Sequence, residues 1–210
     1  MMIGYFANGQ KNNLVFGLDG GANYLFNPNF NSSDYIINAT PICVPTFGLS
    51  LGYYLIDDIS IKSGFYYSPV TNYKINDAEV LNDWFDEWRV KDFKAFSYIF
   101  PLVLKIDVPI NKLMVFLELG GSMNIVVGSV NTVQFLNGDG IRNDPFFEQN
   151  ISLCAGLGAS YPIYKNIGLG AEIIYSNEFG QDYNPNLCKF LQTLIGITYT
   201  TAFANKSISK

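Results

Sequence analysis

Residues 14–24 have the sequence Leu-Val-Phe-Gly-Leu-Asp-Gly-Gly-Ala-Asn-Tyr, in which apolar side chains alternate with glycine and polar side chains. Leu14, Phe16, Leu18, Ala22 and Tyr24 share one parity, and Gly17, Asp19, Gly21 and Asn23 share the other. A period of two is typical of a β-strand whose two faces meet different surroundings. The stretch therefore predicts a strand with one apolar face and one small or polar face.

The same alternation returns along the chain, so that eight strands are expected. They cover about residues 13–26, 45–55, 59–69, 95–108, 113–127, 150–161, 167–177 and 188–203. Long polar segments (27–40, 70–94, 128–149 and 178–187) alternate with tight turns (56–58, 109–112 and 162–166). An even strand number with alternating long and short loops is typical of outer-membrane barrels. We therefore predict an all-β fold, an eight-stranded antiparallel up-and-down transmembrane β-barrel.

The composition suits a membrane protein that crosses with strands. Apolar residues make up 49% of the chain and charged residues 15%, against about 25% charged in soluble domains. The longest apolar run, 98–104, contains Pro101 and is far shorter than the ~18 residues of a spanning helix. A closed barrel is the other structure that satisfies its backbone hydrogen bonds inside lipid. The net charge of −5 and the lack of a basic cluster argue against nucleic-acid binding.

The ends of the chain and of the strands suggest a location. Residues 1–9 resemble the end of a signal peptide, with the small-x-small stretch Ala7-Asn8-Gly9, although an ordinary irregular terminus is the alternative. Residues 10–210 form the barrel domain. In outer-membrane barrels the short turns face the periplasm, which places both termini there. Aromatic residues near both ends of the strands suit the two interfacial girdles of such a barrel.

Six charged side chains inside the predicted strands fall on the small or polar parity. They are Asp19, Lys62, Lys105, Asp107, Glu118 and Glu172. A lysine near the middle of the lipid face costs a barrel about 2–4 kcal/mol, so this parity must face the lumen. Counted from the short-turn ends, all but Asp107 lie at a similar depth. We therefore predict a lumen ion-pair layer of Asp19, Lys62, Lys105, Glu118 and Glu172 that fills the barrel; a proton or ion path is the alternative.

A known family shares the pattern around the second tight turn. Residues 98–105, Tyr-Ile-Phe-Pro-Leu-Val-Leu-Lys, precede this turn, and residues 116–122, Phe-Leu-Glu-Leu-Gly-Gly-Ser, follow it. They resemble the core of the PorT-like outer-membrane β-barrel family of Bacteroidota, and the strand count and loop rhythm extend the resemblance from residue 11 onwards. The resemblance implies an eight-stranded outer-membrane barrel. It implies no single activity, although some members are accessories in protein secretion.

Residues that could carry chemistry are few. The chain has no histidine, which removes the His-dependent mechanisms of barrel hydrolases. Glu118 and Glu172 are the candidate carboxylate pair, but two nearby lysines favour salt bridging. Cys43, Cys154 and Cys188 lack metal-ligand spacing, and a disulfide between Cys43 and Cys188 is an open alternative. We expect no enzymatic activity, no cofactor and no metal site.

The 70–94 loop contains both tryptophans of the chain, Trp84 and Trp88. Asn76 and Glu79 match a helix capping box, and apolar side chains follow at helical spacing. One hypothesis is a surface helix that binds a partner, such as another envelope protein, through the two tryptophans. The alternatives are a loop that folds its aromatic side chains onto the barrel rim and an extended hairpin above the membrane.

These observations favour a small, non-enzymatic outer-membrane barrel with a plugged lumen. It contacts lipid around its wall and acts through its external loops as a structural or accessory partner, in a secretion or envelope complex. A narrow passive channel for ions or small solutes is the main alternative. A secreted, lipocalin-like ligand-binding barrel is the other alternative, but it needs an apolar lumen and a charged exterior, the reverse of this pattern.

Overall fold

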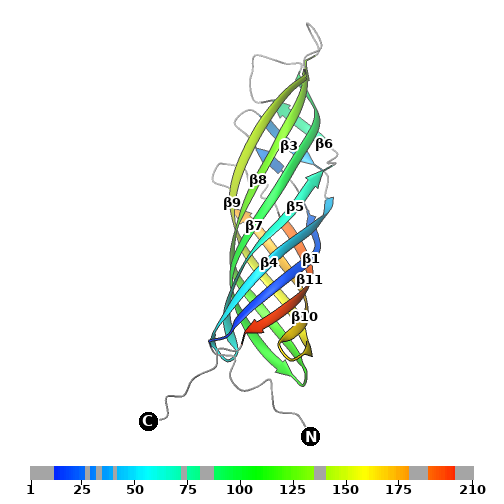
Figure 1. Ribbon diagram of the computed structural model, residues 1–210. Coiled ribbons are helices and arrows are strands. Elements are labelled where there is room, and N and C mark those ends of the chain that lie inside the picture. Colours follow the sequence, from blue (N-terminus) through cyan, green and yellow to red (C-terminus); the bar gives the residue numbers. More distant parts are fainter. Residues whose placement is uncertain are drawn as a thin grey trace, which may run out of the picture.

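A computed structural model describes residues 12–26, 29–31, 35–39, 42–71, 75–80, 88–134, 141–179 and 189–201. Eight strands form a closed antiparallel barrel in the order β1-β11-β10-β9-β8-β7-β5-β4 (Figure 1). Their bounds are β1 Leu14–Leu25, β4 Ile42–Ile56, β5 Ile59–Thr71, β7 Trp88–Ile110, β8 Leu113–Gln134, β9 Ile141–Tyr164, β10 Ile167–Phe179 and β11 Lys189–Thr201. Because β1 pairs with both β4 and β11, the sheet has no open edge around the barrel. The predicted fold class is confirmed.

The outer wall of the barrel is apolar. Leu18 and Ile195, for example, are 64% and 65% exposed, and large apolar side chains are exposed along all eight barrel strands. Exposed aromatic side chains lie near both ends of the wall: Tyr24, Phe47, Phe96 and Tyr175 at one end, and Tyr53, Tyr161 and Tyr199 at the other. Such a wall suits lipid and is the reverse of the lipocalin-like arrangement. In the part of the chain that the structure describes, no helix is long and apolar enough to cross a membrane.

One end of the barrel carries the tight turns. They lie at Asp57–Asp58, Asn111–Lys112 and Lys165–Asn166. Asn111 and Lys165 have positive φ angles of 57° and 36°, the conformation that short hairpin turns need. The first pair of β1 and β11, Leu14 with Thr201, lies at the same end. We name this the turn end and the opposite end the loop end.

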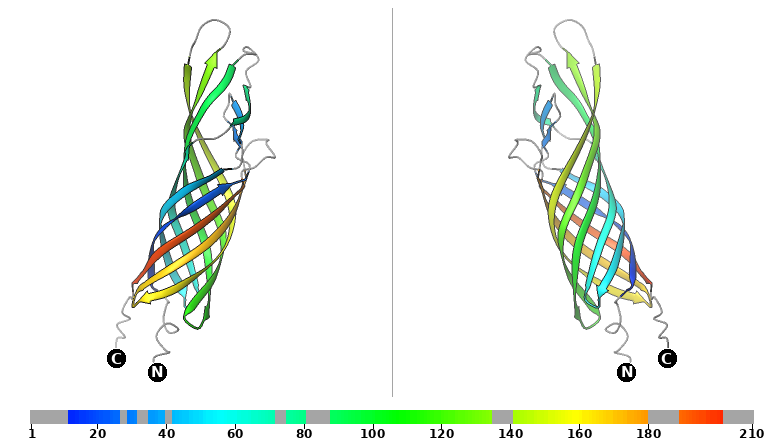
Figure 2. Two further views of the ribbon diagram at one scale, coloured as in Figure 1. Left: turned by 90° about the vertical axis from the view of Figure 1, so that its right-hand side faces the viewer. Right: turned by 90° about the vertical axis from the view of Figure 1, so that its left-hand side faces the viewer.

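Three neighbouring strands run far past the others at the loop end. β7, β8 and β9 have 23, 22 and 24 residues, whereas β1, β10 and β11 have 12, 13 and 13. β5 accompanies β7 only to Thr71–Lys94, and β10 accompanies β9 only to Phe179–Ile151. The segments beyond, 88–93, 127–134 and 141–150, form a three-stranded arm that projects from the barrel (Figures 1 and 2).

A second, smaller sheet lies beside the arm (Figure 2). It consists of β2 (Asn29–Asn31), β3 (Tyr35–Ala39) and β6 (Ile75–Val80), in the order β2-β3-β6. β2 and β3 fall in the segment 27–40, which the sequence predicts as a plain loop. The loop end therefore contains more regular structure than its polar composition suggests.

The structure differs from expectation in two of the long loops. The 128–149 segment is mostly a hairpin, because β8 continues to Gln134 and β9 begins at Ile141, and the β-branched Val130 and Thr132 suit paired strands. The surface-helix hypothesis for the 70–94 loop is contradicted at both ends, since β6 covers Asn76 and Glu79 and Trp88 begins β7. Backbone pairing with distant strands overrides the local helical spacing. Trp84 and residues 1–9, for which the sequence predicts the end of a signal peptide, lie outside the described residues.

Candidate functional site in the lumen

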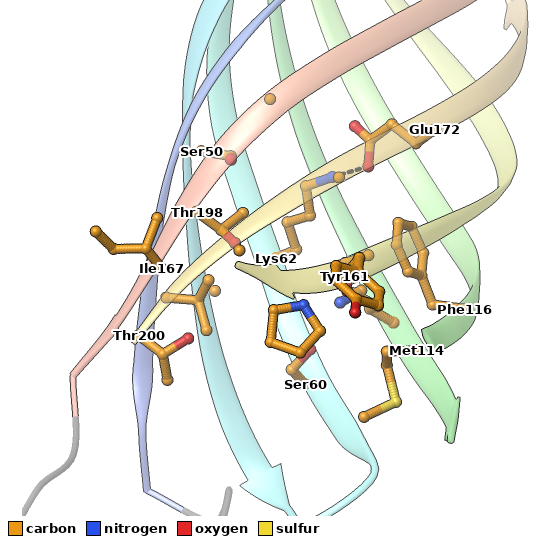
Figure 3. A pocket seen from close by; sticks show the side chains of 18 of the residues that line it. Ser50, Ser60, Lys62, Met114, Phe116, Tyr161, Ile167, Glu172, Thr198 and Thr200 are labelled. Atoms are coloured by element: carbon orange, nitrogen blue, oxygen red, sulfur yellow. Dashed lines mark hydrogen bonds and ion pairs between the residues drawn. The ribbon is translucent and has the colours of Figure 1, made fainter. Parts of the chain in front are cut away.

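Lys62 joins three strands across the lumen. It projects from β5, and its Nζ donates to Glu118 Oε1 on β8 at 3.1 Å and to Glu172 Oε2 on β10 at 2.5 Å. Figure 3 shows the Lys62 and Glu172 side chains meeting inside the barrel. The side chains of Lys62, Glu118 and Glu172 are only 13%, 1% and 10% exposed. Because a buried charge without a partner is strongly destabilising, this cluster tethers opposite walls of the barrel.

Lys105 has a different acidic partner. Its Nζ lies 2.9 Å from Asp107 Oδ1 and 4.2 Å from the centre of the Phe116 ring. The Tyr54 hydroxyl donates to the other oxygen of Asp107, Oδ2, at 2.5 Å. Lys105 and Asp107 are two residues apart on β7, so their side chains share the lumen face. This spacing was the sequence signal for a local pair.

Asp19 is held by hydroxyl groups. Its Oδ2 accepts hydrogen bonds from Ser50 Oγ at 2.8 Å and from the Tyr66 hydroxyl at 3.1 Å. Among the described residues, no lysine pairs with it. The predicted five-residue layer is thus divided: Glu118 and Glu172 meet at Lys62, while Lys105 and Asp19 have partners outside the predicted set.

An apolar cluster fills the lumen on the loop-end side of Lys62. Tyr66, Ile99 and Phe190 are its largest members, and Tyr66 and Phe190 are 0% and 1% exposed. The other members are Leu25, Val44, Ala95, Val103, Val126, Cys154, Ile174 and Leu194. A Cβ on Gly48 or Gly64 would overlap the Tyr66 ring, so these glycines make room for it. The sequence predicted that polar side chains fill the lumen. The apolar side chains there were missed, although Ile99 has the same parity as the inward-facing Lys105.

A buried polar cluster lies near the loop end. Glu178 is 3% exposed, and its carboxylate accepts hydrogen bonds from Asn124 Nδ2 at 2.6 Å and from Asn150 Nδ2 at 3.4 Å. Ser97 Oγ donates to the amide oxygen of Asn124 at 2.6 Å. Sequence reasoning missed Glu178 because the predicted strand ended at residue 177. Extending the alternation from Glu172 would have placed it in the lumen.

On the other side of Lys62, the lumen is open. A cavity of about 690 Å³ extends from Lys62 and Glu172 to the turn residues Lys112 and Lys165. Figure 3 shows Ser60, Thr198 and Thr200 along this space. Small residues line much of the β10–β11 side, namely Gly168, Gly170, Gly196, Thr198 and Thr200. The barrel interior is therefore filled toward one end and hollow toward the other.

The remaining candidate ligands do not converge. Cys43 is exposed and Cys154 is buried, and both are free thiols; Cys188 lies outside the described residues. Within the described ranges, no group of three or more Cys, Asp or Glu side chains is placed to hold a metal ion. What the lumen offers is a set of fixed charges and hydroxyl groups beside an open space.

Comparison with known proteins supports the architecture. No protein-family model and no curated protein matches the chain, so the resemblance to the PorT-like family stays a prediction. The chain is similar in structure to Neisserial surface protein A, with a TM-score of 0.52 and 16% identity over 89% of this chain and 96% of that chain. It is also similar to a major outer membrane protein from Thermus thermophilus, with a TM-score of 0.50 and 11% identity over 90% and 99% of the two chains. The chain therefore has the fold of small outer-membrane β-barrels.

Proposed function

We propose that this protein is a non-conducting outer-membrane barrel that serves as a surface accessory protein and presents its arm to an external partner. The proposal rests on the arm, because its three strands continue from the barrel wall, with one bulge in β7 between Val90 and Asp92. The arm has six to ten residues per strand. At roughly 3.3 Å per residue and a tilt of about 40°, these reach about 15–25 Å beyond the barrel. A paired sheet of this length positions a surface away from the membrane.

The surface of the arm suits recognition. Phe147 is 64% exposed on β9, although the arm lies beyond the apolar wall of the barrel. Large exposed aromatic side chains are frequent anchors in protein interfaces. Trp88 begins the arm on β7, so a partner that binds Trp84 and Trp88 would contact the arm as well.

The filled lumen argues for a barrel that does not conduct. The apolar cluster around Tyr66 and the tether at Lys62 occupy the interior between the cavity and the loop end. An eight-stranded barrel is only wide enough for its own side chains, so such filling leaves little room for ions. In outer-membrane barrels the long loops lie outside the cell and the short turns lie in the periplasm. The proposal therefore has the arm outside the cell and the turn end in the periplasm.

Recordings in planar lipid bilayers test the closed lumen. We expect the refolded protein to give no conductance steps. A variant with Tyr66→Ala, Ile99→Ala and Phe190→Ala serves as the positive control, because it removes the largest side chains of the apolar cluster. Stepwise conductance of the wild-type protein would support the narrow channel and overturn the closed scaffold.

Cysteine labelling on intact cells tests the orientation. In a background with Cys43→Ser and Cys188→Ser, a membrane-impermeant maleimide should label Asn143→Cys on the arm. The matched variant Lys112→Cys, at the turn end, should react only after the outer membrane is opened. The opposite labelling order would reverse the proposed orientation.

Affinity isolation from detergent-solubilised membranes tests the partner. The double variant Trp84→Ala, Trp88→Ala should lose a protein that the wild-type barrel retains. Tyr175→Ala, on the lipid-facing wall, is the control and should keep it. An unchanged set of retained proteins in the double variant would remove the two tryptophans from the proposal.

A further inference from the structure

The cavity at the turn end has its own shape and charge, independent of the arm. It measures about 690 Å³, within the usual range of about 300–1,000 Å³ for small-molecule sites. Two glycines help to keep it open. A Cβ added to Gly170 would meet no atom closer than 3.8 Å, and one added to Gly52 none closer than 3.6 Å. Larger side chains would fit at both positions, so the space is not imposed by backbone packing there.

Carboxylates outnumber cations where the cavity ends. Asp19 and Glu172 line it, and Glu118 lies directly behind Lys62. Lys62 contacts Glu118 and Glu172. Lys105 also lines the cavity, but its ammonium group is paired with a fourth carboxylate, Asp107. Glu118 and Glu172 therefore share one ammonium group at the closed end, and Asp19 has no lysine partner among the described residues.

Glu172, one of these carboxylates, is incompletely bonded. Its side chain is 10% exposed, and its Oε2 accepts a hydrogen bond from Lys62. Its other oxygen, Oε1, is buried and has no hydrogen-bond partner among the described residues, and the same is true of Glu118 Oε2. A buried polar atom without a partner costs about 1–3 kcal/mol or more when it is charged. The contact with Lys62 therefore leaves part of the negative charge of Glu118 and Glu172 unsatisfied at the closed end of the cavity.

We propose that this cavity is a binding site for a small organic cation, whose ammonium or guanidinium group points toward Glu172 and Asp19. Such a group supplies positive charge and several hydrogen-bond donors at once. A bare metal ion fits less well, since no three acidic or thiol side chains in the described ranges are placed to hold one. Lys112 and Lys165 at the mouth favour a guest with one cationic head and a neutral or anionic tail.

Nuclear magnetic resonance of the refolded protein in lipid nanodiscs tests this site. We expect n-butylammonium chloride to cause saturable shifts of the amide signals of Gly52, Gly170 and Gly196. Sodium butyrate, of similar size and opposite charge, should not cause them, and neither should potassium chloride at equal ionic strength. Equal shifts with all three salts, or no saturable shift with butylammonium, would overturn the proposal.

Two variants locate the guest. Glu172→Gln should weaken butylammonium binding about tenfold or more, because it removes one charged acceptor. Gly170→Leu should abolish binding by filling the cavity, whereas Gly20→Leu on the outer wall should preserve it. If Gly170→Leu does not fold, Gly52→Val fills the same space from β4. Full binding by a folded cavity-filling variant would place the cation elsewhere and contradict the proposed site.

Discussion

The same alternation of inward and outward side chains runs through both ends of the barrel, but one end of the lumen is filled and the other is open. On the loop-end side of Lys62, Tyr66 and Phe190 occupy the interior almost without exposure. On the turn-end side, Gly52 and Gly170 hold equivalent inward positions and leave a cavity of about 690 Å³. A period of two determines which side chains enter the barrel. The sizes of those side chains determine whether they fill it.

The difference has a physical basis in neighbouring strands. A large inward side chain needs small inward residues beside it, as Gly48 and Gly64 show next to Tyr66. Where small residues face one another without such a partner, as on β10 and β11 at the turn end, the space stays open. The filled side should therefore respond strongly to truncation and the open side should tolerate added volume.

The largest expected effect comes from emptying the filled side. Tyr66→Ala should lower the free energy of unfolding by about 4 kcal/mol, since it leaves a cavity where a buried aromatic ring was. It also removes the hydrogen bond to Asp19. Urea titration in lipid vesicles, with folded protein measured by gel mobility without boiling, gives the change. Tyr175→Ala on the outer wall is the control and should cost about 1 kcal/mol; a similar loss in both variants would contradict a packed loop-end side.

A somewhat smaller effect is expected at the boundary between the two sides. Lys62→Met should destabilise the barrel by about 3 kcal/mol near neutral pH, because Glu118 and Glu172 lose their shared cation. The cost should shrink in acid, where protonated carboxyl groups need no cation. The same urea titration at neutral and acidic pH measures both quantities.

Two further variants isolate the charge effect at Lys62. Adding Glu118→Gln and Glu172→Gln to Lys62→Met should restore most of the stability. Lys105→Met should cost less, about 2 kcal/mol, since one carboxylate instead of two loses its cation and Asp107 keeps its bond from Tyr54. Equal losses at Lys62 and Lys105 would show that packing of the lysine stems, and not the paired carboxylates, determines the effect.

Most of the barrel could be predicted from the sequence because the alternation that defines each strand lies within a short stretch of residues. Parity around Phe16 or Leu18 is visible in a single strand, and the cost of charge in lipid fixes the inward face of Lys62 and Glu118. The arm could not be predicted in this way. A polar composition between residues 128 and 149 suits a loop and an exposed hairpin equally, and only pairing between β8 and β9 distinguishes them.

The sequence predicted which charged side chains face the lumen, but it did not predict which residues they contact. Depth along each strand placed Lys62, Lys105, Glu118 and Glu172 close together, but partners depend on strand order and side-chain reach. β5 and β10 are not neighbours in the sheet, so the Lys62–Glu172 contact crosses the lumen. The cavity was not predictable at all, because it arises from a mismatch of volumes among residues far apart in the chain.

The smallest expected effect comes from adding one methyl group on each side of Lys62, which tests whether side-chain volumes leave the turn end open. Gly64→Ala should destabilise the barrel by about 2 kcal/mol, because its Cβ would lie 2.8 Å from the Tyr66 ring and 2.9 Å from the Leu49 carbonyl oxygen. Gly170→Ala, an identical change on the open side, should stay within about 0.5 kcal/mol of wild type. Parallel urea titrations of the two variants measure the contrast. Equal destabilisation would mean that the backbone, and not the open volume, requires glycine at residue 170. A clear difference would identify the turn end as the part of this barrel that can take up additional atoms, whether from a side chain or from a bound guest.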